Sequence, residues 1–354
     1  MKAAASLAIL ACGFAAAMWW CAWPAPGGAR PELGMGLVAG SLTAGPLIDR
    51  RSRKAVLIAG LALLGGASWG LTAAPDAWMR PLVAALGLGA GMTLLAGNAL
   101  VCAAGGANRA QSLNLIGILL PVGAILTPAF GTGSLALAAG VVSAVALAVA
   151  AWTPMAGRAP LETAAAGKRP AIPLLALLLF LYAACEAGVW GWLVEYWGVA
   201  RVLDHLTAWL ILCYGLPLGL MAGRAASARL LAAIAPLTLL RFAGLAMAFA
   251  TGLMLLARSP SASCVAAFAV GLAMAPVLPT TLAVAAGALP GRPATGMGMA
   301  LAAGWLGMAA SSPLIAWIAG RSSLQTAMLL LPVLSLAAAQ VAMAMTPRNR
   351  PRVS

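Results

Sequence analysis

The sequence predicts an all-α polytopic membrane protein with twelve transmembrane helices arranged as two six-helix bundles. Hydrophobic residues make up 63% of the 354 residues and charged residues only 8%, whereas a soluble domain contains about 25% charged residues. The hydrophobic residues form long continuous runs, and most charges lie in the short connectors between them. Because a bilayer offers no water to the backbone, spanning segments must satisfy their own hydrogen bonds, which favours helices. A membrane β-barrel would need alternating polarity instead.

Apolar runs of about 18 to 25 residues can cross a hydrocarbon core of about 30 Å. The first run lacks a convincing signal-peptide cleavage site and ends in Trp19 and Trp20, which suit a membrane interface, so we count it as a helix. The twelve predicted spans are 4–23, 31–48, 55–73, 81–104, 111–130, 134–153, 173–194, 206–223, 237–257, 262–286, 296–319 and 324–346.

Basic residues indicate the orientation of these spans. With a cytoplasmic N-terminus and alternating sides, sixteen of the 21 Lys and Arg residues fall in the cytoplasm, Arg224 and Arg229 among them. This bias follows the positive-inside rule and accounts for the net charge of +14 without a nucleic-acid partner. We expect both termini in the cytoplasm. The short loops suit a bacterial inner membrane.

The longest connector divides the chain into two halves. The predicted domains are an N-terminal six-helix bundle over 1–153, a cytoplasmic linker over 154–172, a C-terminal six-helix bundle over 173–346 and a basic cytoplasmic tail over 347–354. Two bundles joined in this way are typical of secondary transporters that bind cargo near the membrane midplane. Because one chain provides both halves, we expect it to function as a monomer in the lipid bilayer.

A dense cluster of charges connects the second and third predicted spans. Gly45, Leu47, Asp49 and Arg50 are followed by Arg53 and Lys54. Gly45 permits close helix approach, and Asp49 can pair with guanidinium groups or with a helix N-terminus. The cluster resembles the G-x-L-x-D-R-x-G-R-K signature of the major facilitator superfamily, with Ser52 in place of the last glycine. This resemblance implies a cytoplasmic gate, which Arg109 at the start of the fifth span would assist.

Other segments resemble the fucose/glucose/galactose–proton symporter branch of that superfamily. They are the runs 109–115 and 181–186, and Gly271 with Pro276. That branch carries acids in its first and fourth helices, whereas this chain has no acid in the first span and Leu94 in the fourth. A sugar needs many converging hydrogen-bond partners, and the predicted cavity is too apolar to provide them. We therefore do not expect this protein to share the sugar specificity of that branch.

Glu186 lies near the middle of the seventh predicted span and is the sharpest candidate for a functional residue. Ionisable residues at membrane depth are usually functional, and this carboxyl group could bind and release a proton as access alternates. Alternatives are a protonated acid that bonds a neighbouring helix, or direct contact with a cationic cargo. Tyr182 and Trp190 lie four residues on either side and share its helix face, where they could bind cargo or pack against another helix.

The remaining candidates are weaker. Asn98, Gln111 and Asn114 lie toward the cytoplasmic ends of the fourth and fifth spans, where interhelical hydrogen bonding competes with cargo binding. His205 is the only histidine and is expected in an outer loop without a role. Six scattered cysteines indicate small buried apolar residues rather than metal ligands. We predict no metal or cofactor, and no catalytic constellation that would make the protein an enzyme.

These patterns favour a secondary active transporter that moves a small organic solute by alternating access, with Glu186 as the candidate proton-coupling residue. No Gly-rich nucleotide-binding loop followed by Lys and Ser or Thr is present, so direct ATP drive is not expected. The alternative is a membrane sensor or scaffold that keeps the transporter fold without transporting. The cargo and its direction of movement do not follow from the sequence.

Overall fold

The computed structural model describes residues 2–20, 31–130, 132–154 and 171–345. Every regular element in these ranges is helical, as the composition predicted. Most of the predicted linker and the basic tail lie outside the described residues, as do Cys21 and the arginines that those segments carry.

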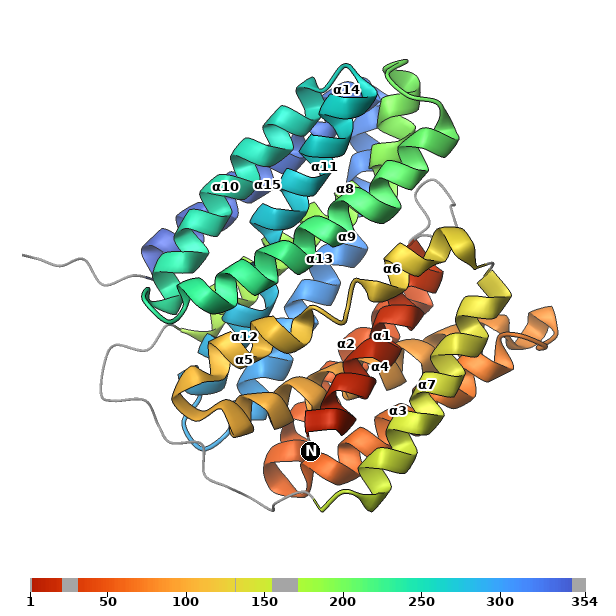
Figure 1. Ribbon diagram of the computed structural model, residues 1–354, viewed down its shortest axis with the longest axis vertical. Helices are drawn as coiled ribbons and strands as arrows, with labels where there is room; N and C mark the ends of the chain where they lie inside the picture. Colours follow the sequence, from red (N-terminus) through yellow and green to blue (C-terminus); the bar gives the residue numbers. More distant parts are fainter. Residues whose placement is uncertain (1, 21–30, 131, 155–170, 346–354) are drawn as a thin grey trace, which may run out of the picture.

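The N-terminal half forms one group of helices, drawn in red to yellow in Figure 1. Within this group α2 packs on α4, α3 lies between α4 and α7, and α1 packs against α7 and α4. The elements are α1 (Lys2–Trp20), α2 (Pro31–Arg50), α3 (Arg53–Gly70), α4 (Asp76–Gly105), η1 (Gly106–Asn108), α5 (Arg109–Gly117), α6 (Val122–Leu126), η2 (Thr127–Ala129) and α7 (Thr132–Trp152).

The C-terminal half forms a second group, drawn in green to blue beside the first (Figure 1). Here α13 packs on α8, α9 packs on α11, and α10 packs on α15. The elements are α8 (Ile172–Val199), α9 (His205–Leu230), α10 (Pro236–Leu256), α11 (Pro260–Met274), α12 (Val277–Ala288), α13 (Pro293–Arg321), α14 (Leu324–Met328) and α15 (Leu330–Ala344). The two groups meet where α13 contacts α2 and where α5 contacts α9 and α12.

Eight helical stretches in the described part of the chain are long and apolar enough to cross a membrane. One of them, Asp76–Ala129, runs for 54 residues and covers two of the predicted spans. The helices otherwise follow the predicted ranges closely, but this measure of length and composition does not confirm a count of twelve. The chain is therefore a multi-span membrane protein whose count of twelve spans stays a prediction.

Three predicted spans are interrupted in the structure. The predicted span 324–346 has a short break at Leu329, between α14 and α15, and the other two breaks occur at prolines. The predicted helix 111–130 ends at Gly117 and resumes at Val122, and the predicted helix 262–286 ends at Met274 and resumes at Val277. A proline precedes each new start, Pro121 in the first case and Pro276 in the second. Proline has no N–H to donate and its ring clashes with the carbonyl of residue i−4, which explains both breaks.

Helix α9 is longer than predicted, and this corrects the position of Arg224. The predicted span ended at residue 223, with Arg224 in a cytoplasmic connector, whereas the helix continues to Leu230. Arg224 is only 2% exposed and lies inside the protein. Its assignment to the cytoplasmic loop residues was therefore wrong, while Arg229 is exposed in the last turn of the same helix.

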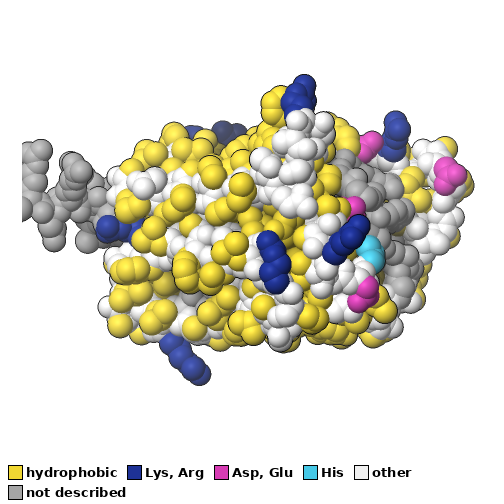
Figure 2. Space-filling view, turned by 90° about the horizontal axis from the view of Figure 1, so that it is seen from above, with side chains coloured by type: hydrophobic (Ala, Val, Ile, Leu, Met, Phe, Trp, Pro, Cys, Tyr) yellow, Lys and Arg dark blue, Asp and Glu magenta, His cyan; other side chains and the backbone are white. Residues whose placement is uncertain are grey.

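Apolar side chains cover the outside of the molecule as well as its core. Figure 2 shows hydrophobic side chains across most of the visible face, with lysine and arginine side chains few and far apart. Phe249 is 70% exposed, Val265 is 69% exposed and Trp317 is 56% exposed. An apolar surface of this extent suits a protein whose solvent is a bilayer. Cys264 is also exposed, contrary to the expectation that the cysteines are buried, although Cys12, Cys102, Cys185 and Cys213 are buried as expected.

Close helix packing depends on glycines where α2 crosses α4. A Cβ atom at Gly87 would collide with the Leu33 carbonyl and lie 3.1 Å from the Leu37 nitrogen. Gly66 on α3 is the contrasting case, because a Cβ atom there meets nothing within 4 Å. Close approach of backbones through small residues is the usual basis of helix packing in membranes.

We predict opposite effects of alanine at these two glycines. Gly87→Ala should destabilise the protein by about 1–3 kcal/mol, because overpacking forces α2 and α4 apart. Gly66→Ala should be neutral or stabilise by up to about 1 kcal/mol, because alanine is the better helix former. Thermal unfolding of the purified protein in detergent measures both, and equal effects of the two variants would contradict the packing argument.

Candidate functional site

A cavity of about 160 Å³ lies at the interface of the two helix groups. The N-terminal group contributes residues of α1, α2, α4 and the break after α5, and the C-terminal group contributes residues of α8, α9, α12 and α13. Most of the lining is apolar, and Leu94, which replaces the acid of the symporter branch, is part of it. Among the residues that the structure describes, Glu186 and Arg224 are the only charged ones that line this cavity.

Helix α8 places three of the predicted site residues together. Tyr182, Glu186 and Trp190 all line the cavity, so the helix face predicted from their spacing of four residues is the face that meets it. Tyr182 is 1% exposed, whereas Glu186 and Trp190 are half-buried. The face is therefore a row of two aromatic rings with a carboxyl group between them.

Arg224 enters the same cavity from α9, on the other side of the interface between the groups. Its Nη1 donates a hydrogen bond to the carbonyl oxygen of Gly117, the last residue of α5. Residue i+4 is Pro121, which has no N–H to complete the α-helical bond. The carbonyl therefore accepts a 3.1 Å turn hydrogen bond from the Leu120 amide and keeps a second lone pair for Arg224. The absence of a side chain at Gly117 leaves room, since a Cβ atom there would lie 3.3 Å from the Arg224 Cδ.

The polar groups in the cavity are only partly paired. Glu186 and Arg224 interact electrostatically without forming a direct salt bridge, and Tyr182 interacts with both. The Arg224 Nε and the Tyr182 hydroxyl are buried without hydrogen-bond partners. Buried polar groups are almost always hydrogen-bonded in proteins, and an unpaired one costs about 1–3 kcal/mol. The cavity wall therefore contains two donors without a hydrogen bond of normal geometry, although Tyr182 lies close to both Glu186 and Arg224.

Trp305 lines the cavity from α13 and ties the two groups together. Its indole Nε1 donates a hydrogen bond of 3.0 Å to the Ser41 hydroxyl of α2. A Trp ring of this kind supplies a large apolar face and one polar edge. Trp305 was not singled out from the sequence, because an isolated tryptophan in an apolar run has no distinguishing local pattern.

Asp49 at the end of α2 caps the N-terminus of α13. Its Oδ1 accepts a hydrogen bond of 3.1 Å from the Ala294 amide, and its Oδ2 accepts bonds of 2.8 and 2.7 Å from the amide and hydroxyl of Thr295. The predicted pairing of Asp49 with a helix N-terminus is confirmed, since a carboxylate satisfies the free amides and the positive end of the helix dipole.

The residues around Asp49 hold neighbouring helices close. A Cβ atom at Gly45 would lie 2.9 Å from the Thr295 Cα, so this glycine permits the predicted close approach of α2 and α13. Lys54 donates to the carbonyl oxygens of Ala151 at 2.8 Å and Thr153 at 3.1 Å, at the end of α7. Arg50 and Arg53 flank this contact in the sequence and also have interaction partners.

Arg109 makes a further contact between the groups. It is half-buried at the start of α5, and a Cβ atom at Gly287 of α12 would lie 2.5 Å from its Nη2. The guanidinium group therefore occupies the space that Gly287 leaves open. Its predicted role in a gate stays a prediction, although the position between α5 and α12 suits that role.

The predicted amide residues lie away from the cavity lining. Asn114 bonds the Ala110 carbonyl at 2.9 Å and the Thr280 hydroxyl of α12 at 3.1 Å, and Asn98 bonds the Leu94 carbonyl at 2.8 Å within α4. Asn98, Asn114 and Gln111 are not among the residues that form the cavity wall. Asn114 thus makes an interhelical hydrogen bond, the alternative to cargo binding that its position suggested.

Polar groups at the opposite helix ends have structural roles. His205 is exposed at the start of α9, where Asp204 caps the helix by accepting a 3.0 Å hydrogen bond from the Thr207 amide. Within the described ranges, no three His, Cys, Asp or Glu side chains gather as a metal site would require.

No protein-family model matches the sequence, and no curated protein matches it either. The fold, however, is that of known transporters. The chain is similar to a variant of the E. coli fucose:proton symporter FucP, with a TM-score of 0.75, 16% identity and 98% coverage of both chains. It is also similar to the human organic anion transporter MFSD10, with a TM-score of 0.80, 17% identity, and coverage of 96% of this chain and 98% of that one. The proton:xylose symporter XylE matches with a TM-score of 0.77, 11% identity, and coverage of 98% and 95%.

These similarities show that the chain has the fold of the major facilitator superfamily over nearly its whole length, as the charge cluster after the second span indicated.

We predict that the Asp49 cap protects the start of α13 from solvent. Asp49→Ala removes three hydrogen bonds, and the loss of a helix cap costs about 1 kcal/mol. Hydrogen–deuterium exchange should therefore accelerate by about fivefold at the Ala294 and Thr295 amides. Asp76→Ala, which removes an exposed acid from the first turn of α4, is the matched control and should leave these amides unchanged. Unaltered exchange in Asp49→Ala would show that the cap does not hold the two groups together.

Proposed function

We propose that this protein is a secondary active transporter that moves a small organic solute by alternating access, with Glu186 as its proton-coupling residue. The observation that carries the proposal is the cavity at the interface of the two helix groups, which contains Glu186 and Arg224 in an otherwise apolar wall. A site at the interface of two halves is the arrangement on which rocking transporters depend. The similar structures of FucP and XylE, both described as proton symporters, support this assignment.

The proposed architecture is two six-helix bundles, residues 1–153 and 173–346, joined by a cytoplasmic linker over 154–172. In this arrangement twelve spans place both termini and the tail 347–354 in the cytoplasm, and the bacterial inner membrane is the proposed location. The cap that Asp49 provides on α13 supports a cytoplasmic gate between the bundles. Gly45, Arg50, Arg53, Lys54 and Arg109 are the other proposed gate residues.

Glu186 suits proton coupling because of its surroundings. It shares the cavity with Arg224, and the other titratable residues that line it are Tyr182 and Cys12. Protonation of a carboxyl group near a fixed guanidinium changes the net charge of the pair from zero to +1, which lets the proton and the cargo influence each other. Tyr182 and Trp190 would contact the cargo directly. Asn98, Gln111 and Asn114 do not line the cavity and would affect cargo binding only indirectly.

A non-transporting sensor or scaffold with the same fold is the alternative. Such a protein would bind a ligand in the cavity and would not need to exchange protons at Glu186. The two functions differ in a single observable, which is net movement of cargo across a sealed membrane.

We predict that Glu186→Gln abolishes proton-driven uptake. Proteoliposomes that contain a trapped pH-sensitive dye would be given an imposed pH gradient and a panel of carboxylates, organic cations, amino acids and sugars. Wild-type protein should acidify or alkalinise the lumen with at least one cargo. Glu186→Gln should lose nearly all of that response, because glutamine cannot exchange a proton.

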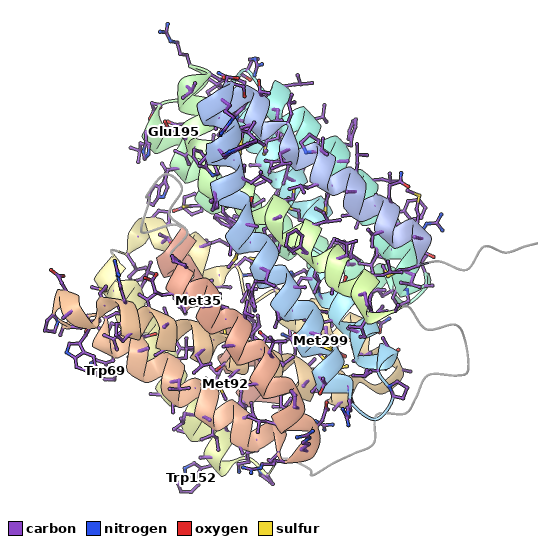
Figure 3. All side chains as sticks on the ribbon, turned by 180° about the vertical axis from the view of Figure 1, so that it is seen from behind. Met35, Trp69, Met92, Trp152, Glu195 and Met299 are labelled. Atoms are coloured by element: carbon purple, nitrogen blue, oxygen red, sulfur yellow. The ribbon has the colours of Figure 1, made fainter. Side chains whose placement is uncertain are left out.

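Glu195→Gln is the matched control on the same helix. Glu195 is exposed near the end of α8, away from the centre of the molecule (Figure 3). This variant should transport like the wild type. If Glu186→Gln and wild type gave the same proton flux, Glu186 would be a structural acid. If no cargo moved by either the dye or a direct uptake assay, the scaffold alternative would replace the transporter.

A further inference from the structure

Two buried hydrogen-bond donors in the cavity wall lack a partner of normal hydrogen-bond geometry. The Arg224 Nε and the Tyr182 hydroxyl have no partner, although Arg224 is 2% and Tyr182 is 1% exposed. They come from α9 and α8, and both residues line the same cavity. Because buried donors are almost always paired, two such donors in residues that line one cavity indicate that a bound ligand supplies acceptors.

The charged side chains of the cavity wall indicate which charge the ligand carries. The Arg224 guanidinium cannot lose its proton in a protein, and one of its nitrogens is already used by the Gly117 carbonyl. In the described part of the wall its one charged neighbour is Glu186, which makes no direct salt bridge with it. When Glu186 carries a proton, the cavity holds one uncompensated positive charge. A buried charge needs a partner, and a carboxylate provides one with two acceptor oxygens.

The apolar part of the cavity wall indicates the polarity and size of the rest of the ligand. Apart from these groups the cavity is lined by aliphatic and aromatic side chains such as Leu37, Leu94 and Trp305. Its volume is about 160 Å³, and an apolar cavity of about 150 Å³ in another protein binds benzene. The body of the ligand is therefore apolar and about the size of one six-membered ring.

We propose that the cavity binds a compact apolar monocarboxylate, with its carboxylate on Arg224 and Tyr182 and its apolar body against the leucines and Trp305. This inference rests on the proposed function and names the substrate class of the same site. A proton on Glu186 and a carboxylate on Arg224 enter together and sum to zero charge. Transport of such a cargo is therefore electroneutral symport, which changes the luminal pH without producing a current.

Cations and sugars fit the cavity less well than a carboxylate. A cation would have to lie in the same small cavity as the fixed guanidinium, at a like-charge cost that Glu186 alone must offset. A sugar would need an acceptor or donor for each hydroxyl, and the wall outside the polar cluster offers few. The wall suits a ligand that is polar at one end only.

The first test is titration calorimetry of the purified wild-type protein in detergent with three probes of one shape. Benzoate is the carboxylate, benzamide is its neutral isostere, and benzylamine is the cation. Benzoate should bind at least tenfold more tightly than either of the others. Equal affinity for benzoate and benzamide, preference for benzylamine, or no binding of any carboxylate in a wider set of ring-sized and branched carboxylates would overturn the proposal.

Variants then locate the carboxylate. Arg224→Gln should weaken benzoate binding by at least tenfold and leave benzamide unaffected, while Tyr182→Phe should weaken benzoate binding by a smaller factor. Arg229→Gln is the matched control, because Arg229 is exposed on the same helix. Since loss of the bond to Gly117 could unfold Arg224→Gln, Tyr182→Phe, which removes only one hydroxyl group, keeps the location testable. Unchanged benzoate binding in Tyr182→Phe and in folded Arg224→Gln would place the carboxylate elsewhere.

Failure of this inference is distinguishable from failure of the proposed function. Benzoate binding without any flux in liposomes would keep the anion site and exclude transport. Flux of a cation or a sugar without carboxylate binding would keep the transporter and exclude the anion site. Uptake of benzoate that exceeds the passive entry of benzoic acid into protein-free liposomes, with a pH change and no current, would support both. A current carried with benzoate would contradict the electroneutral coupling.

Discussion

The buried guanidinium of Arg224 is the constraint around which the centre of this molecule is organised. A charge at membrane depth must be matched by acceptors from the protein, because the surrounding bilayer supplies none. The chain provides one acceptor where a helix breaks, since Pro121 leaves the Gly117 carbonyl without its α-helical partner, and this carbonyl then accepts from both the Leu120 amide and Arg224. The interruption of α5 therefore provides the acceptor that allows Arg224 to be buried, and the cavity lies beside this hydrogen bond.

The cavity and the helix cap on α13 connect the same two groups of helices at different depths. Asp49 joins α2 to the start of α13, and Trp305 joins α13 to α2 again at the cavity wall. Helix α13 therefore contacts the N-terminal group both at its beginning and beside the ligand site. A rigid helix with these two attachments would transmit a change at one to the other, because both lie on one element.

Sequence reasoning predicted the helical class, most helix ranges and those charged side chains that stand in a distinctive local sequence pattern. Asp49 was predictable because a charged motif between two apolar runs has few alternatives, and Glu186 because an acid inside such a run is costly. Arg224 was misplaced because it lies one residue beyond an apolar run, where hydropathy cannot distinguish a connector from a continued helix. Its partner is a backbone carbonyl 107 residues away, which no local pattern encodes.

The attachment of Arg224 to Gly117 also bears on how ligand and conformation would depend on each other. Gly117 ends α5 in the N-terminal group, and Arg224 belongs to α9 in the C-terminal group. A relative movement of the groups either preserves this hydrogen bond or breaks it. An acceptor bound at Arg224 would lower the free-energy cost of breaking it, because the guanidinium would still have a partner. Occupancy of the cavity and contact between the groups then share one side chain, so their free energies cannot be independent. This sharing is what distinguishes a site that can drive rocking from a cavity that merely holds a ligand.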